Sequence, residues 1–188
     1  MSPSPDPHGE LERGLECLRE MGFEPVLAEH ALAETGYTAG SAEQRAADIN
    51  AMFADPSIRA IIASHGGQVA HGVLPHLDWD AMRTNPTIFM GFSNITTLNL
   101  AIHARTGLVT FNGNMVMWHL GMEPTDYDLD EFRAVLMDGR SGRVPKNSSW
   151  VTVRDGDARP GRLVGDALGL RGLAQTAYQV PFDDDLLL

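Results

Sequence analysis

A short strand that turns directly into a helix limits most strongly what this chain can fold into. Residues Thr87 to Met90 form an apolar, β-prone run, and Asn94 to Arg105 follows with apolar residues at helical spacing. Ser93 stands at the turn between the two. A serine there lies beside the first free N–H groups of the helix and the positive end of its dipole, where developing negative charge is stabilised. The pattern therefore predicts a nucleophile elbow.

A simpler interpretation of Ser93 is that its side chain caps the helix that begins at Asn94. The spacing also differs from the G-x-S-x-G of hydrolases, because Gly91 lies two residues before the serine but Ile95 lies two after it. On the local pattern alone, both a nucleophile and a helix cap remain open.

Strands and helices alternate along the first 113 residues, which favours an α/β fold with a parallel sheet flanked by helices. Sites in such folds form beyond the carboxyl ends of the strands, where His65-Gly66-Gly67 and Ser93 both lie. The expected strands are Glu24 to Ala28, Arg59 to Ser64, Thr87 to Met90 and Leu108 to Phe111; the expected helices are Glu10 to Met21, Ser41 to Ala54, Gln68 to Leu77 and Asn94 to Arg105.

After Gly113 the pattern loosens. We expect a helix over Asp130 to Met137, a polar linker over 139–149, an edge strand over Trp150 to Val153 and a helix over Asp166 to Ala174. A further strand is expected to begin at Leu186. This divides the chain into an α/β domain carrying the elbow (1–113), a connecting segment (114–160) and the start of an incomplete C-terminal domain (161–188).

Composition excludes several classes of function. The formal charge is 14 − 25 = −11, spread along the chain, which disfavours nucleic acid or an anionic membrane as a partner. With no signal-like N-terminus and no long apolar run, a cytoplasmic location is expected. The single cysteine, Cys17, excludes an internal disulfide. The histidines His65, His71 and His76 lack a ligand set at zinc spacing, so neither a metal nor a cofactor is expected.

A run of landmarks in the first 113 residues resembles the LD-carboxypeptidase family of serine peptidases, which includes the muramoyl-tetrapeptide carboxypeptidases and the microcin C immunity peptidases. The segments that carry the resemblance are Gly36-Tyr-Thr-Ala-Gly40, Arg45-Ala-Ala-Asp48, Phe53-Ala-Asp-Pro56, Arg59-Ala-Ile-Ile62, Gly66-Gly67, Leu74-Pro-His-Leu-Asp78, Asn85-Pro86, Gly91-Phe-Ser-Asn-Ile-Thr96 and Thr106-Gly-Leu-Val-Thr-Phe111. A weaker match continues through Trp150, Gly161 to Gly165 and Tyr178.

The resemblance implies that Ser93 is the nucleophile on the α/β domain, with a glutamate and a histidine supplied by a later C-terminal domain. Backbone N–H groups of the Gly66-Gly67 turn and of Asn94 would form the oxyanion hole, because glycine lets the backbone approach a reacting carbonyl closely. His65 would contact substrate or be a plain loop residue. The implied substrate is a small murein-type peptide with an LD-amide bond, the alternative is a microcin-like aminoacyl or peptidyl nucleotide, and a homodimer is expected.

Several positions depart from the family pattern. The family usually has arginine at His65, aspartate at Asn94 and a Gly-Gly-Asn turn where this chain has Gly165-Asp166-Ala167. Its first strand should precede Ser2, and its catalytic glutamate should follow the strand that begins at Leu186. Since no glutamate occurs after residue 131 and no histidine after residue 119, we expect weak activity of these 188 residues alone. A non-catalytic ligand-binding homologue is the second hypothesis.

Overall fold

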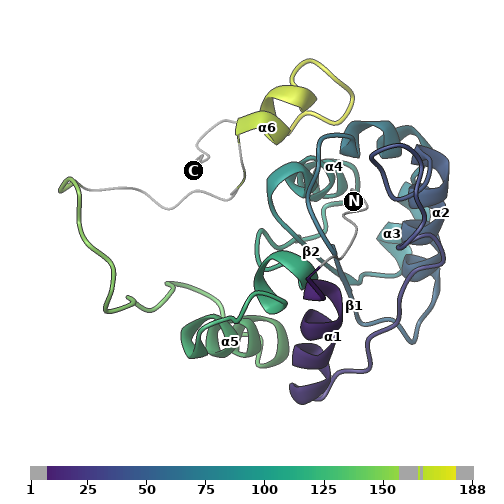
Figure 1. Cartoon of the computed structure of the whole chain (residues 1–188). Coiled ribbons are helices and arrows are strands. Elements are labelled where there is room, and N and C mark those ends of the chain that lie inside the picture. The colour runs from purple at the N-terminus through teal and green to yellow at the C-terminus, as the bar shows by residue number, and fades with distance from the viewer. Residues whose placement is uncertain (1–7, 157–164, 166, 181–188) are drawn as a thin grey trace.

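The computed structural model describes residues 8–156, 165 and 167–180 (Figure 1). Its elements are α1 (Glu10–Glu20), α2 (Ala42–Ala54), β1 (Ala60–Ile62), the 3₁₀ helix η1 (Ala70–His76), α3 (Trp79–Thr84), β2 (Ile88–Met90), the 3₁₀ turn η2 (Ser93–Ile95), α4 (Thr96–Thr106), the π turn η3 (Val116–Leu120), α5 (Asp126–Phe132), the π turn η4 (Arg133–Met137) and α6 (Ala167–Leu173).

The centre of the fold is a short parallel sheet. Strands β1 and β2 pair in parallel with Ile61 opposite Phe89. A parallel bridge from Met90 to Phe111 extends the sheet on the far side of β2. The expected strand over Leu108 to Phe111 is reduced to this one bridge, in which the Phe111 N–H donates to the Phe89 carbonyl at 2.9 Å.

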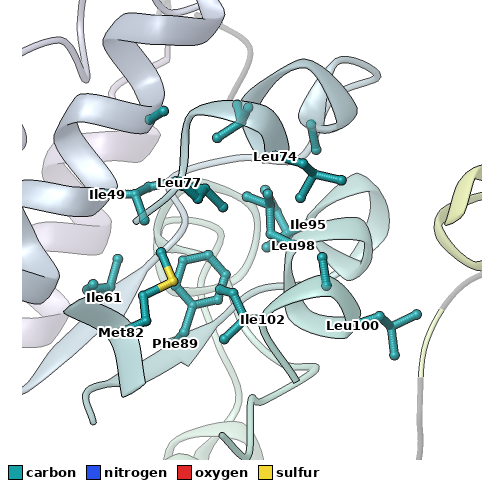
Figure 2. Packing of buried hydrophobic residues seen from close by; sticks show 14 of the residues in the cluster. Ile49, Ile61, Leu74, Leu77, Met82, Phe89, Ile95, Leu98, Leu100 and Ile102 are labelled. Carbon is teal, nitrogen blue, oxygen red and sulfur yellow. The ribbon is translucent and has the colours of Figure 1, made fainter. Parts of the chain in front are cut away.

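Helices cover both faces of this sheet. Since successive strand residues point to opposite sides, each strand contributes side chains to two core clusters. Ile61 and Phe89 pack into the larger core cluster with residues of α2 and α4 (Figure 2). Ile62 and Met90 contact the second cluster, which contains Leu11, Leu15 and Leu18 of α1 and Val116, Met117 and Leu120 of η3. The α/β class predicted from the alternating pattern is therefore confirmed.

Local signals set the helix boundaries. Helix α1 ends one residue before Met21, and Gly22 follows with a φ of +92°. Helix α2 begins with the predicted capping box, in which the Ser41 hydroxyl accepts from the Gln44 N–H and the Gln44 amide oxygen accepts from the Ser41 N–H. No described helix is long and apolar enough to cross a membrane.

The predictions of two strands were wrong. Residues 24–28 and 150–153 are irregular, and neither segment pairs with a strand in the described part of the chain. Val26 is 62% exposed and Val153 is 98% exposed. Both stretches have β-prone residues, but an extended segment becomes a strand only when a neighbouring backbone supplies a hydrogen-bonded ladder.

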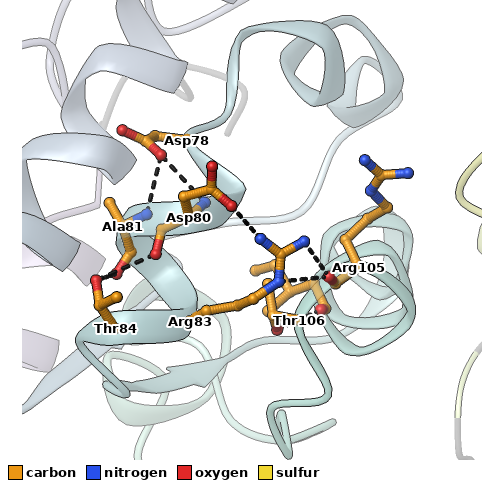
Figure 3. Close-up of polar contacts among 8 residues, drawn as sticks. Asp78, Asp80, Ala81, Arg83, Thr84, Arg105 and Thr106 are labelled. Atoms are coloured by element: carbon orange, nitrogen blue, oxygen red, sulfur yellow. Dashed lines mark hydrogen bonds and ion pairs between the residues drawn. The ribbon is translucent and has the colours of Figure 1, made fainter.

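Helix α3, which the sequence pattern did not predict, braces the end of α4 (Figure 3). Asp78 caps α3 by accepting from the N–H groups of Asp80 and Ala81. The Arg83 guanidinium pairs with Asp80 and donates through Nε and Nη2 to the Arg105 carbonyl, at 3.1 and 2.8 Å. A cation thus satisfies one of the free carbonyl groups at a helix C-terminus.

Helix α6 lies against the N-terminal end of α4. Leu170, Leu173 and Val180 belong to the larger core cluster. A Cβ on Gly169 would lie 2.9 Å from Cβ of Thr96, so this contact requires glycine. The boundaries 1–113, 114–160 and 161–188 stay predictions, and the expected strand from Leu186 lies outside the described residues.

Candidate active site

Ser93 occupies the sharp turn between β2 and α4. Its φ is +58°, in the left-handed region that residues with a side chain rarely adopt. Phe92, one residue earlier, is extended with a φ of −136° and a ψ of −169°, and η2 begins at Ser93 itself. Backbone strain of this kind gathers at functional sites. The turn has the strand-to-helix geometry of a nucleophile elbow.

Gly91 makes this turn sterically possible. A Cβ at this position would lie 2.8 Å from Cγ2 of Ile95 and 3.0 Å from Cβ of Ala63. Both distances are below ordinary carbon–carbon contact, so a larger residue would push η2 away from the end of β1.

The glycine turn after β1 packs directly on Ser93. Gly66 is buried, and a methyl group added to it would lie 3.3 Å from Cβ and 3.4 Å from Oγ of Ser93. Gly67 has a φ of +140°, which favours glycine. The structure therefore brings the Gly66-Gly67 turn and the serine together, as expected for strands that end at one edge of a parallel sheet.

Asn94 connects the elbow to the next segment of the site. Its side-chain oxygen Oδ1 accepts a hydrogen bond of 2.8 Å from the Ala70 N–H, the first residue of η1. The contact links the residue after Ser93 to the chain that continues from Gly67. An acceptor oxygen is what this bond needs, and asparagine provides it as well as aspartate.

A buried residue that the sequence pattern did not single out holds the elbow from behind. Asn99 is 3% exposed, and its Nδ2 donates to the carbonyls of Gly91 at 2.8 Å and Phe111 at 3.3 Å. The backbone carbonyl of Asn99 accepts a hydrogen bond from the Thr110 hydroxyl at 3.0 Å. One side chain thus fastens α4 to the ends of both β2 and the 108–111 segment.

Aromatic rings form a wall beside the serine. The His65 ring meets the Trp118 indole edge-on, with centroids 5.6 Å apart, and Phe92 contacts both Trp118 and His119. Trp118 is 52% exposed. The Met- and Trp-rich run after Gly113 is divided between the core and the surface. Met115 and Met117 are core, whereas Trp118 borders the site.

Burial lowers the pKa of the two histidines in this wall, His65 and His119. Desolvation disfavours the protonated imidazole, so both rings are neutral at neutral pH. The His119 Nδ1 accepts a 3.3 Å hydrogen bond from the Met115 N–H, which leaves the proton of the neutral ring on Nε2. The wall is therefore an uncharged surface.

No histidine or carboxylate in the described part of the chain hydrogen-bonds to the Ser93 hydroxyl. His103, at the other end of α4, donates from Nδ1 to the Leu108 carbonyl at 2.9 Å and stays away from the elbow. Among the same residues, no group of three or more His, Cys, Asp or Glu side chains is placed to hold a metal ion.

A parallel α/β core with a strained serine at the strand-to-helix turn defines a nucleophile-elbow class of protein. The sequence profile of the LD-carboxypeptidase N-terminal domain matches residues 1–113. A Streptomyces coelicolor protein named for carboxypeptidase activity is 41% identical over 90% of this chain and 54% of its own length. The chain belongs to the LD-carboxypeptidase family.

Other similarities agree with this membership. The murein tetrapeptide carboxypeptidase of Pseudomonas aeruginosa is 36% identical over 61% of this chain and 37% of its own length. The solved structure of the microcin immunity protein MccF with glutamyl sulfamoyl guanosine superposes with a TM-score of 0.81 at 26% identity, over 95% of this chain and 62% of that chain. This chain spans about half the length, or less, of such relatives.

Proposed function

We propose that this chain carries the nucleophile half of a serine carboxypeptidase that cleaves the amide bond before the C-terminal residue of a murein-type peptide. The observation that carries the proposal is the left-handed Ser93, held against Gly66 at the carboxyl edge of the sheet. Membership of the LD-carboxypeptidase family supports the reaction class.

In this mechanism the Ser93 Oγ attacks the scissile carbonyl carbon while its proton passes to a base. The carbonyl oxygen becomes an oxyanion, which the N–H groups of Gly67 and Asn94 would stabilise. Collapse of this intermediate breaks the C–N bond, and the protonated base returns its proton to the departing amine. Water then hydrolyses the acyl-enzyme and regenerates the serine. His65 is assigned to the substrate-facing wall, in agreement with its ring contact to Trp118.

The base is assigned to the glutamate and histidine that the resemblance places in a C-terminal domain. No group in the described part of the chain hydrogen-bonds to the Ser93 hydroxyl, and the match to the Streptomyces coelicolor relative covers only 54% of that protein's length. A serine without a base loses several powers of ten in rate, so slow hydrolysis by these 188 residues alone is expected.

The proposal is tested by measuring release of D-alanine from a murein tetrapeptide. Ser93→Ala should abolish whatever release the protein gives, whereas Ser148→Ala, at an exposed loop position, should leave it unchanged. Equal release by the wild type and Ser93→Ala would remove Ser93 from the mechanism.

A second candidate substrate is a microcin-like aminoacyl or peptidyl nucleotide. The similarity to MccF, solved with glutamyl sulfamoyl guanosine, favours it. So does the half-exposed Trp118, which contacts Phe92, the residue before the serine, because an indole face can stack on a nucleobase. Hydrolysis of a glutamyl sulfamoyl nucleotide and of the tetrapeptide should be compared on the same preparation, and the faster reaction identifies the substrate class.

The competing hypothesis is a non-catalytic ligand-binding homologue. The neutral residues His65 and Asn94 at the site motivate it, as does a Ser93 hydroxyl that makes no hydrogen bond to a base among the described residues. A fluorophosphonate probe separates the two hypotheses, since an activated serine is labelled rapidly and stoichiometrically. Mass spectrometry should then locate the adduct on Ser93; absence of labelling on a folded protein would favour the binding hypothesis.

We also propose a homodimer, as the family resemblance implies, a cytoplasmic location, and a division of the chain into segments 1–113, 114–160 and 161–188. Light scattering after size-exclusion chromatography measures the molar mass and so tests the homodimer. Limited proteolysis tests the division into segments, because cleavage should concentrate in residues 141–156 of the connecting segment, all of which are exposed except Asn147.

A further inference from the structure

Helix α1 and the π turn η3 lie side by side and meet backbone to backbone (Figure 1). Gly14, buried in the middle of α1, has no room for a side chain, because a Cβ there would overlap the Val116 carbonyl oxygen and lie 2.9 Å from the carbonyl carbon. Gly121, directly after η3, repeats this contact in the other direction. Its Cβ would overlap the Glu10 carbonyl oxygen and lie 2.8 Å from that carbonyl carbon. The close approach of the two elements therefore requires glycine on both.

Hydrogen bonds from two sides also fix η3 in place. From α1, the Arg13 Nε donates to the Gly121 carbonyl at 3.0 Å. From η3, the Val116 N–H donates to the carbonyl of Ala63, the residue after β1, at 3.1 Å. The π turn is therefore clamped between α1 and the carboxyl end of β1, which is the edge of the sheet where the site lies.

The clamped turn carries Trp118 to the elbow. The indole contacts the rings of His65 and Phe92, with centroids 5.6 and 6.4 Å away. His65 directly precedes Gly66, and Phe92 directly precedes Ser93. Because Trp118 is 52% exposed, part of its ring is free to contact a bound molecule. Turns of the π type recur at functional sites.

We propose that Gly14 is a positioning residue for substrate: by admitting the Val116 backbone it fixes η3, and so holds Trp118 where it contacts the group bound beside Ser93. The inference deepens the proposed function and rests on it for the choice of ligand. Alanine at position 14 would place its Cβ 2.8 Å from Cγ1 of Val116. Since packed carbon atoms lie about 3.5–4.0 Å apart, α1 and η3 would have to separate by roughly 1 Å. A misplacement of that size far from the reacting atoms can cost about a hundredfold in rate.

The first test follows Trp118 without any ligand. The chain has three tryptophans, so Trp79→Phe with Trp150→Phe leaves Trp118 as the sole indole. In this background Gly14→Ala should shift the fluorescence emission maximum and change the acrylamide quenching constant. Gly156→Ala, at an exposed glycine with open space around it, should change neither. Circular dichroism verifies that each variant is folded.

The second test measures the Kd of the murein tetrapeptide and of glutamyl sulfamoyl guanosine by calorimetry, which needs no hydrolysis. For the ligand that binds the wild type more tightly, Gly14→Ala should raise the Kd roughly 2- to 10-fold, the loss of one aromatic contact. In a Trp118→Ala background the same substitution should no longer change the Kd, because its effect passes through the indole. A purely structural role of Gly14 would weaken binding equally in both backgrounds.

A milder variant keeps the inference testable if Gly14→Ala does not fold. Arg13→Met removes the bond to the Gly121 carbonyl and should change the Trp118 fluorescence in the same direction, whereas Arg19→Met, at an exposed position on the same helix, should not. Unchanged Trp118 fluorescence in the folded variants, or a loss of affinity that persists without Trp118, would overturn the inference. If neither ligand binds the wild type, the proposed function fails, while the fluorescence still decides whether α1 positions Trp118.

Discussion

Replacing Ser93 by glycine and by alanine gives a direct measure of the strain at the elbow. At an ordinary helical position, glycine is less stable than alanine by about 0.5–1 kcal/mol. Ser93 has a φ of +58°, where a Cβ costs about 1–2 kcal/mol. Alanine at position 93 retains that cost and glycine removes it. The greater conformational freedom of glycine in the unfolded chain, however, destabilises the folded glycine variant by about 0.4–1 kcal/mol. Ser93→Gly should therefore be more stable than Ser93→Ala by roughly 0.5–1 kcal/mol.

Urea unfolding with a common m-value measures this difference. In a chain of 188 residues, it corresponds to a Tm difference of about 1–4 °C. Ala104→Gly supplies the matched control, because Ala104 is an exposed residue of α4; there glycine should destabilise by about 0.5–1 kcal/mol. If glycine were no more stable than alanine at position 93, the left-handed elbow would be refuted, and with it the basis for assigning the nucleophile.

Three further outcomes are expected. Asn99→Leu keeps the side-chain volume but leaves the buried Gly91 carbonyl without its donor, so the free energy of unfolding should fall by about 1–3 kcal/mol in urea titrations. Leu173→Ala, at a site 1% exposed, should cost about 2–4 kcal/mol, whereas Val153→Ala, at a site 98% exposed, should change stability by less than about 0.5 kcal/mol. Burial lowers the pKa of His119. Its neutral ring therefore favours the folded state above about pH 6.5, the ordinary histidine pKa, and this contribution to stability is lost as the pH falls below that value. Between about pH 7.5 and 5.5, the Tm of His119→Gln should therefore fall less than the Tm of the wild type.

The sequence predicted those parts of the fold that depend on neighbouring residues. The apolar, β-prone run followed by apolar residues at helical spacing located β2 and α4, and Gly91 and Ser93 fell at the turn between them. The capping box located the start of α2. These signals work because the side chains that decide the local conformation are adjacent in the chain.

Pairing over long distances could not be predicted in the same way. Residues 24–28 have a strand-like composition, but a strand also needs a partner backbone, and the described chain has an apolar cavity between this segment and β1. Asn99 resembles an exposed polar residue on α4, since nothing nearby in sequence marks the carbonyls of Gly91 and Phe111 as its partners. Trp118 and His119 approach the elbow because the N–H groups of η3 bond to the end of β1.

Asn94, the residue after Ser93, shows why the site can depart from the family pattern and keep its architecture. The Asn94 Oδ1 accepts from the Ala70 N–H at 2.8 Å, so the bond that joins the elbow to η1 needs only an oxygen. Asparagine removes a negative charge beside the place where the substrate's carbonyl oxygen would become an oxyanion, and a like charge there is unfavourable. His65, where the family usually has arginine, is neutral as well, since burial lowers its pKa. The two changes together remove one charge of each sign and leave the local net charge nearly unaltered. In the proposed mechanism, electrostatic stabilisation of the oxyanion would therefore fall to the backbone N–H groups of Gly67 and Asn94.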